Sequence, residues 1–212
     1  MFRGIIFDFD GVIVDTEADK FAHLTTVLAA HGYALQRRDF SSMAGKKTKH
    51  FLAQRFPAMP TRVIELIVAK RQRHVLSSAR RLRLIPGLRP LLAYLAKRQV
   101  RVGLATGSER RVVKAALKEH KLIKYFSVLI TGEDFRTSKP SPECYLLALK
   151  GLRLPARDVA AIEDSPAGIA AAKSAGCMVV ALTTTVGASK LRKADRILKN
   201  HTEVLRFLKT LS

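Results

Sequence analysis

The chain has 212 residues, of which 48% are hydrophobic and 26% are charged, and its formal net charge is +21. This length suits one α/β domain, or a core domain with a modest insertion, and the apolar content excludes a disordered chain. Two cysteines are too few for a disulfide framework and fit a reducing compartment. No apolar run approaches the roughly 18 residues that a membrane-spanning helix needs.

The apolar N-terminus resembles the start of a signal peptide, but aspartates interrupt it before a usable hydrophobic region forms. We therefore expect a cytoplasmic protein with no membrane partner. The excess of Lys and Arg favours anionic partners, which include phosphorylated metabolites, nucleic acid and acidic surfaces. These basic residues are scattered singly and in pairs, and no helix-turn-helix, RNA-binding or zinc signature is present. We interpret them as a solvated basic surface and do not expect nucleic acid as a partner.

Strand-like runs alternate with amphipathic helical patterns along most of the chain. The helical patterns have apolar residues three and four positions apart. The strand-like runs are rich in Val, Ile and Ala without polar alternation, which is typical of a parallel sheet covered on both faces. These runs are residues 4–9, 100–105, 126–131, 159–162 and 178–182. The pattern predicts a doubly wound α/β fold with a parallel sheet.

One stretch interrupts this alternation. Residues 16–83 show helical periodicity and no convincing strand, and they carry 14 Lys and Arg against 4 Asp and Glu. A helical block between the first and second strands of a parallel sheet is typical of an inserted cap. We predict a core domain of residues 1–15 and 84–212 and an all-helical cap domain of residues 16–83.

Two carboxylates, Asp8 and Asp10, follow the first predicted strand. Residues i and i+2 of a strand lie on the same side, so these side chains can converge on one site. Ligand sites of open α/β sheets lie beyond the carboxyl ends of the strands, which is where this pair falls. Two carboxylates so close repel each other unless a cation or a proton intervenes. A Mg²⁺ ion is the natural solution, because it prefers oxygen ligands.

Three further clusters follow other predicted strands. They are Thr106-Gly107-Ser108, Lys139-Pro140 and Glu163-Asp164. Hydroxyls and backbone N–H groups at a helix start suit phosphate oxygens, an ammonium group neutralises phosphate charge, and further carboxylates could complete a metal site. Each cluster alone is also compatible with a loop, a solvated lysine or a helix cap. Their joint placement at one edge of one sheet favours a functional site.

Together these segments resemble the four ordered motifs of the haloacid dehalogenase (HAD) superfamily of phosphohydrolases, in the branch with a helical cap after the first strand. The similarity is greatest to β-phosphoglucomutase-like and phosphoglycolate phosphatase-like members. It implies that Asp8 attacks phosphorus and forms an aspartyl-phosphate, and that Asp10 is the general acid and base. It implies that Thr106, with Gly107 and Ser108, and Lys139 hold the transferring phosphoryl group.

The resemblance also implies the metal ligands. Mg²⁺ would be bound by Asp8, the backbone carbonyl of Asp10 and Asp164, with Glu163 nearby or ligating. The presence of Asp10 argues against the dehalogenases of the superfamily, which lack that second carboxylate. Capped members are monomers by default, so we expect a monomer.

The predicted cap departs from the mutases of the superfamily. Those resemble one another in a cap His ten residues after the acid/base Asp, where this chain has Lys20. Their Lys-Gly-x-Ser-Arg loop corresponds here to residues 44–48, in which Gly45 is kept while Lys46 and Lys47 could grip a distal anionic group. These differences favour a phosphatase of a small phosphorylated metabolite, such as a sugar phosphate or phosphoglycolate. The alternatives are a β-phosphoglucomutase-like mutase and, more remotely, a polyanion-binding protein.

Overall fold

The computed structural model of the protein describes residues 2–43 and 48–211. Its centre is a six-stranded sheet in the order β5-β4-β1-β6-β7-β8, in which every neighbouring pair is parallel. The strands are β1 (Gly4–Phe7), β4 (Arg101–Ala105), β5 (Val128–Ile130), β6 (Val159–Glu163), β7 (Met178–Leu182) and β8 (Arg196–Leu198). The five predicted strands are confirmed, and each end lies within two residues of the prediction. The short edge strand β8 was not predicted.

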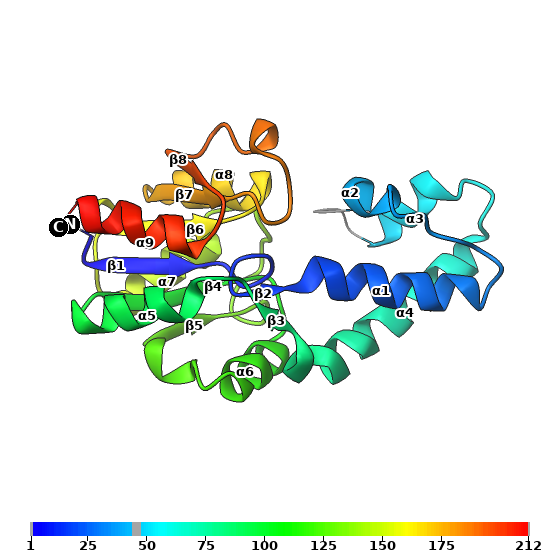
Figure 1. Cartoon of the computed structure of the whole chain (residues 1–212), viewed down its shortest axis with the longest axis horizontal. Coiled ribbons are helices and arrows are strands. Elements are labelled where there is room, and N and C mark those ends of the chain that lie inside the picture. The colour runs from blue at the N-terminus through cyan, green and yellow to red at the C-terminus, as the bar shows by residue number, and fades with distance from the viewer. Residues whose placement is uncertain (1, 44–47, 212) are drawn as a thin grey trace.

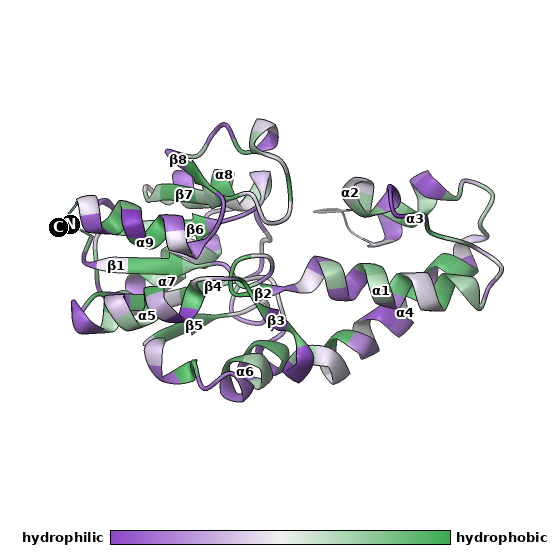
Figure 2. Ribbon diagram, viewed as in Figure 1, coloured by the Kyte–Doolittle hydropathy of each residue, from purple (hydrophilic) through white to green (hydrophobic). Residues whose placement is uncertain are grey.

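Helices cover both faces of the sheet (Figure 1). One face carries α5 (Leu88–Lys97), α6 (Arg110–Glu119) and α9 (His201–Thr210), and the other carries α7 (Glu143–Leu152) and α8 (Pro166–Ser174). Figure 2 shows hydrophilic and hydrophobic residues alternating along α6 and α9, as expected of helices with one buried face. None of the described helices is both long and apolar enough to cross a membrane.

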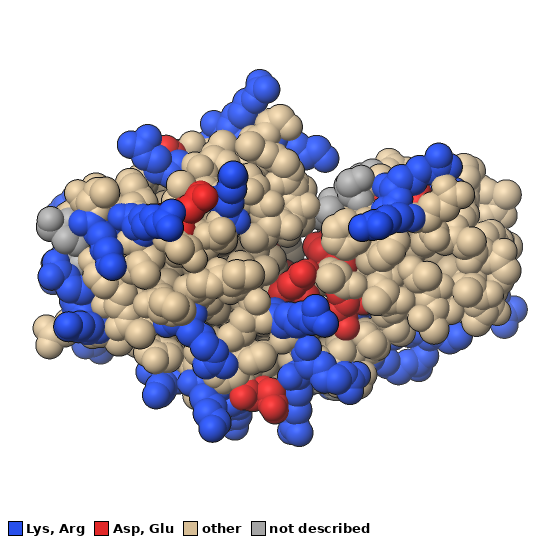
Figure 3. Space-filling view, in the orientation of Figure 1, with Lys and Arg blue, Asp and Glu red and all other residues tan. Residues whose placement is uncertain are grey.

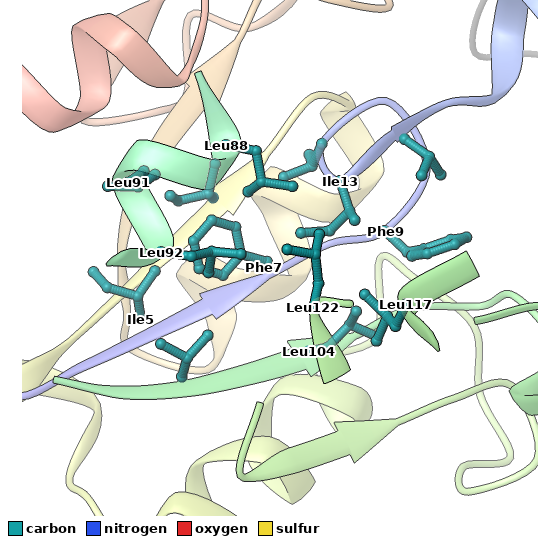
Figure 4. Packing of buried hydrophobic residues seen from close by; sticks show 14 of the residues in the cluster. Ile5, Phe7, Phe9, Ile13, Leu88, Leu91, Leu92, Leu104, Leu117 and Leu122 are labelled. Carbon is teal, nitrogen blue, oxygen red and sulfur yellow. The ribbon is translucent and has the colours of Figure 1, made fainter. Parts of the chain in front are cut away.

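Two apolar clusters hold these layers together. Along β1, Ile5 and Phe7 join the cluster beneath α5, α6 and α9, whereas Ile6 joins the cluster beneath α7 and α8. Figure 4 shows the first cluster, in which Leu88 and Leu91 of α5 lie near Phe7. Because a strand alternates its side chains, an unbroken apolar run can serve both clusters. Each fully buried side chain of this kind contributes about 1.5–3 kcal/mol.

The chain leaves and re-enters the core through a two-stranded antiparallel pair, β2 (Val14–Asp15) and β3 (Arg83–Leu84). Between them lie α1 (Thr16–Ala29), α2 (Asp39–Met43), α3 (Thr48–Arg55), α4 (Thr61–Ser78) and the short 3₁₀ turn η1 (Ala79–Arg81). These helices enclose an apolar cluster of their own and extend beyond the carboxyl end of β1 (Figure 1). The predicted cap boundaries fall at the β2–β3 pair, and the division into two domains stays a prediction.

Local signals set the start and end of α1. The Oδ1 atom of Asp15 accepts a hydrogen bond of 3.0 Å from the backbone N–H of Ala18, which caps the first turn. Gly32, with φ of 78°, turns the chain after the helix ends. The helix therefore projects directly from β2, and its first turns lie next to the carboxyl edge of the sheet.

Candidate active site

The predicted motif segments meet at the carboxyl edge of the sheet. Asp8 follows β1, Thr106 follows β4, and Asp164 follows β6, while Lys139 arrives from the loop between β5 and α7. The Nζ atom of Lys139 lies 2.7 Å from Oδ1 of Asp8 and 2.6 Å from Oε1 of Glu163. Residues separated by up to 131 positions in sequence are therefore in direct contact.

Three buried carboxylates form a compact cluster at this edge. Asp8, Glu163 and Asp164 each place a carboxylate oxygen within 4.8 Å of the others. Burial raises the pKa of Asp8 to about 7, although the neighbouring Lys139 acts in the opposite direction. Burial, and then the charges of Glu163 and Asp8, raise the pKa of Asp164 well above its ordinary value. The cluster thus holds more negative charge than one lysine compensates, and its oxygen donors fit a hard divalent cation.

Lys139 is the central cation of the site. Its Nζ atom also donates to the backbone carbonyl of Ala105 at 3.1 Å and lies 5.0 Å from the ring centre of Tyr145. Burial by itself would lower the pKa of Lys139, but the carboxylates of Asp8 and Glu163 outweigh it and raise this pKa well above its usual range. The ammonium group is therefore permanently charged and held in one place.

Glu163 is completely buried and has several partners. Besides Lys139, its carboxylate accepts the hydroxyl of Tyr145 at 2.7 Å, and the backbone N–H of Asp164 at 3.1 Å. Gly168 in α8 makes room for it, because a Cβ atom there would collide with the carboxylate. Lys139 and Tyr145 therefore both donate hydrogen bonds to the carboxylate of Glu163. Sequence reasoning missed Tyr145, because a tyrosine in an amphipathic helix has the pattern of an ordinary core residue.

Asp10 lies beside the three-carboxylate cluster, and its side chain is not part of it. The hydroxyl of Ser108 donates to Oδ2 of Asp10 at 2.5 Å, and Oγ1 of Thr106 accepts the backbone N–H of Ser108 at 3.1 Å. Thr106 is buried, whereas Gly107 is exposed and has open space beside its Cα atom. The second motif therefore contacts the first one directly through Ser108.

A carboxylate binds the start of α6. The N–H of Arg110 donates to both carboxylate oxygens of Glu133, at 2.9 and 3.1 Å. The prediction that the hydroxyls and backbone N–H groups of Thr106-Gly107-Ser108 suit phosphate oxygens stays a prediction. Glu133 thereby satisfies one of the donors that a helix start leaves open. This carboxylate follows β5, and nothing in its local sequence indicated that it would reach a different helix.

Of the predicted specificity residues in the helical segment, the structure describes Lys20 alone. Lys20 in α1 is buried, and its Nζ atom lies 3.4 Å from both carboxylate oxygens of Glu17. Burial lowers the pKa of Lys20, while the charges of Glu17 and, more weakly, Asp10 act in the opposite direction. The described partner of Lys20 is therefore Glu17, in the same helix. Gly45, Lys46 and Lys47 lie outside the described residues.

Charged side chains are unevenly distributed over the surface. On the face shown in Figure 3, Lys and Arg are dispersed over both the core and the helical segment. Acidic side chains gather where these two parts meet. The dispersion agrees with a solvated basic surface, and the acidic region lies close to the carboxyl edge of the sheet.

Comparisons with known proteins give the family. The sequence profile of the haloacid dehalogenase-like hydrolases matches residues 5–182. The chain is 30% identical over 205 residues to a validoxylamine A 7'-phosphate phosphatase from Streptomyces hygroscopicus subsp. limoneus, with 96% of each chain covered. It is 31% identical over 178 residues to a phosphorylated carbohydrates phosphatase from Thermotoga maritima, with 82% of each chain covered.

A solved structure agrees with these relatives. A candidate β-phosphoglucomutase from Thermotoga maritima superposes with a TM-score of 0.80 at 28% identity, over 99% of this chain and 100% of that chain. The likeness confirms the predicted α/β fold with its parallel sheet. The family match takes in all four motif segments described above. The chain therefore belongs to the haloacid dehalogenase-like hydrolase family and is one of its phosphatases.

Proposed function

We propose that the protein is a Mg²⁺-dependent phosphatase that hydrolyses a small phosphorylated metabolite of the sugar-phosphate or phosphoglycolate type. The observation that carries this proposal is the contact of Lys139 with Asp8 and Glu163 beside Asp164, at one edge of the sheet. Two relatives whose names include a phosphorylated carbohydrate or a 7'-phosphate support the substrate class.

Asp8 and Asp164 are the residues that would hold the metal, together with the backbone carbonyl of Asp10. Glu163 lies in the same carboxylate cluster but already accepts hydrogen bonds from Lys139 and Tyr145, so we assign it to the positioning of Lys139. When bound, Mg²⁺ supplies positive charge that offsets the crowded carboxylates and the phosphoryl oxygens.

The proposed hydrolysis proceeds in two steps. In the first, a carboxylate oxygen of Asp8 bonds to phosphorus and the bond to the leaving oxygen breaks, while Asp10 gives its proton to that oxygen. In the second, Asp10 takes a proton from water, the water oxygen bonds to phosphorus, and inorganic phosphate leaves Asp8. Lys139 and Thr106 hold the phosphoryl oxygens, and Ser108 orients Asp10 through the hydrogen bond of 2.5 Å.

We assign substrate choice to the helical segment, residues 16–83, acting as a cap over the catalytic edge. Lys20 is buried in the second turn of α1, which directly follows β2, so it can contact the part of the substrate that carries no transferring phosphoryl group. This placement supports the predicted cap domain and makes Lys20 its first specificity candidate.

The test is phosphate release from p-nitrophenyl phosphate and from a panel of sugar phosphates and phosphoglycolate, with Mg²⁺ and with a chelator. Asp8→Asn should lose activity by several orders of magnitude because it removes the nucleophile. Asp158→Asn, on the opposite edge of the sheet, is the matched control and should retain activity. Turnover retained by Asp8→Asn would refute the nucleophile assignment.

A sugar-phosphate mutase is the second candidate, because the fold superposes on a candidate β-phosphoglucomutase. Incubation with β-glucose 1-phosphate and a catalytic amount of the bisphosphate separates the two functions. Free phosphate indicates the phosphatase, and glucose 6-phosphate indicates the mutase.

A further inference from the structure

The loop that follows the proposed nucleophile forms a closed turn. The backbone carbonyl of Phe9 accepts the N–H groups of Ile13 at 2.8 Å and Val14 at 3.2 Å, and the N–H of Gly11 donates to the carbonyl of Val14 at 2.8 Å. Gly11 has φ of 73°, and a Cβ atom at this position would collide with the side chain of Asp164. The turn therefore packs directly against the metal-binding edge.

Two carbonyl groups of this turn are bound by side chains from the far end of the chain. Oγ1 of Thr184, in the loop after β7, donates to the carbonyl of Gly11 at 2.6 Å. Nε2 of His201, at the start of α9, lies 2.6 Å from the carbonyl of Val12. The hydroxyl of the neighbouring Thr185 contacts the carboxylate of Asp164. Three side chains that follow β7 in sequence thus contact either this turn or the adjacent carboxylate of Asp164.

The state of His201 follows from its surroundings. A carbonyl oxygen only accepts hydrogen bonds, so Nε2 of His201 carries the proton. The side chain is completely buried, and burial lowers its pKa to about 4, so the imidazole is neutral near pH 7. A neutral donor of fixed position is suited to holding a backbone carbonyl over the whole physiological pH range.

The Gly11 carbonyl belongs to the peptide unit between Gly11 and Val12, one residue beyond the peptide that joins Asp10 to Gly11. The N–H of that nearer peptide donates to the carbonyl of Val14, in the same turn. Ser108 holds the carboxylate of Asp10, and Thr184 holds the turn that follows Asp10. Both Thr184 and His201 lie beyond residue 182, where the family match ends.

We infer that Thr184 and His201 are positioning residues, which orient Asp10 for proton transfer to the leaving group by fixing the two peptides on either side of Val12, in the turn that follows Asp10. The inference rests on the proposed role of Asp10 as general acid. Loss of the Thr184 hydrogen bond should therefore harm substrates that need a proton on the leaving oxygen and spare those that do not.

The experiment compares kcat/KM for phenyl phosphate and p-nitrophenyl phosphate, which are similar in size. The p-nitrophenolate leaves readily without a proton, whereas phenolate leaves poorly. Since kcat/KM reports the steps up to leaving-group departure, it isolates the acid role of Asp10 from its later role as a base. Thr184→Val keeps the side-chain shape and should lower kcat/KM about tenfold for phenyl phosphate and less than about threefold for p-nitrophenyl phosphate.

Two variants complete the series. Thr184→Ser keeps the hydroxyl and should restore both values. Thr183→Val is the matched control, since among the described residues the Thr183 hydroxyl has no hydrogen-bond partner, and it should change neither value. His201→Phe should show the same selective loss together with a lower Tm, because it leaves the buried Val12 carbonyl unpaired.

Equal losses on both substrates in Thr184→Val, or no loss on either, would overturn the inference. Asp10→Asn serves as the reference for the proposed function and should show the same leaving-group selectivity in a stronger form. If Asp10→Asn showed no selectivity, the fault would lie in the proposed role of Asp10. If only Thr184→Val failed to show it, the positioning role would be wrong.

Discussion

At the carboxyl edge of the sheet, three carboxylates are buried, and the half-buried Lys139 donates to two of them at 2.6 and 2.7 Å, whereas charged residues of the helical segment mostly face water. Lys49 and Glu65 illustrate the second case: their charged atoms lie 4.0 Å apart, and both side chains are more than 60% exposed. An exposed pair of this kind contributes about 0–1 kcal/mol, while breaking a buried pair costs about 3–5 kcal/mol.

Buried charges at the strand ends and exposed charges of the helical segment suit different roles. Buried and multiply bonded charges keep the positions that chemistry needs, because moving one of them leaves its partners unpaired in a low-dielectric interior. Exposed charges can be exchanged at little cost to the fold. The helical segment can therefore change its contacts to substrate without disturbing the proposed nucleophile and its neighbours.

The largest expected effect on activity is that of replacing Lys139 at the strand ends, compared with replacing Lys49 in the helical segment. Lys139→Met should lower kcat about a thousandfold, because it removes the cation that we assign to the phosphoryl oxygens and leaves the buried carboxylates of Asp8 and Glu163 without their positively charged partner. Lys49→Met, the matched change in the helical segment, should alter kcat less than twofold. Steady-state phosphate release measures both, and a similar loss in the two variants would break the comparison.

Acid pH should weaken the core through His201. Because its pKa is lowered to about 4 in the folded state and is near 6.5 when unfolded, the unfolded chain binds more protons between these values. Stability is therefore lost as pH falls from about 6.5 to 4, by about 3 kcal/mol from this group. Urea unfolding of the wild type and His201→Phe across this range measures the difference, in which the shared contribution of Asp8 cancels. Parallel curves for the two proteins would contradict the prediction.

Mg²⁺ should stabilise the core selectively. At a concentration of about 100 times its Kd, a ligand that binds only the folded state adds about 2.7 kcal/mol. We expect Mg²⁺ to raise the Tm of the wild type and to have little effect on Asp164→Asn, which lacks a proposed ligand. Differential scanning calorimetry with Mg²⁺ and with a chelator provides the measurement, and an equal rise in both proteins would place the ion elsewhere.

The smallest expected effect concerns Asp19, which forms a partly buried ion pair within the helical segment. Asp19 of α1 contacts Arg71 of α4 at 2.9 Å, where the arginine side chain is only 9% exposed, and it contacts His74 at 3.0 Å. Asp19→Asn should cost about 1–2 kcal/mol. Hydrogen exchange should become faster in α1 and α4 while β1 and β6 stay protected. Faster exchange throughout the sheet would show that the two regions unfold together.

Several features of the site could be predicted because their signals are local. Asp8 and Asp10 stand two positions apart after an apolar run, and Lys139 and Asp164 follow strands of the same parallel sheet. A parallel sheet brings the ends of its strands to one edge, so strand order along the chain is enough to gather these residues. The unbroken apolar runs of β1, β6 and β7 indicated a sheet covered on both faces, because a strand without polar alternation has no face suited to water.

Other contacts depend on which side chains meet in three dimensions. Tyr145 reaches Glu163 from the interior of α7, Glu133 caps a helix that precedes it, and Thr184 and His201 hold a turn more than 170 residues earlier. None of these residues stands in a spacing that differs from ordinary core or loop sequence. The edge strand β8 was missed because three residues beginning with an exposed arginine carry too little apolar pattern.

The amino-acid sequence by itself determined the sheet, the inserted helices and the acidic and basic residues at the strand ends, because periodicity and strand ends are properties of neighbouring residues. Only the tertiary structure decided that Glu163 is held by Lys139 and Tyr145, that Glu133 occupies the start of α6, and that the C-terminal part binds the catalytic loop. Hydrogen bonds between distant segments depend on packing, since a buried donor takes whichever acceptor the fold brings within reach.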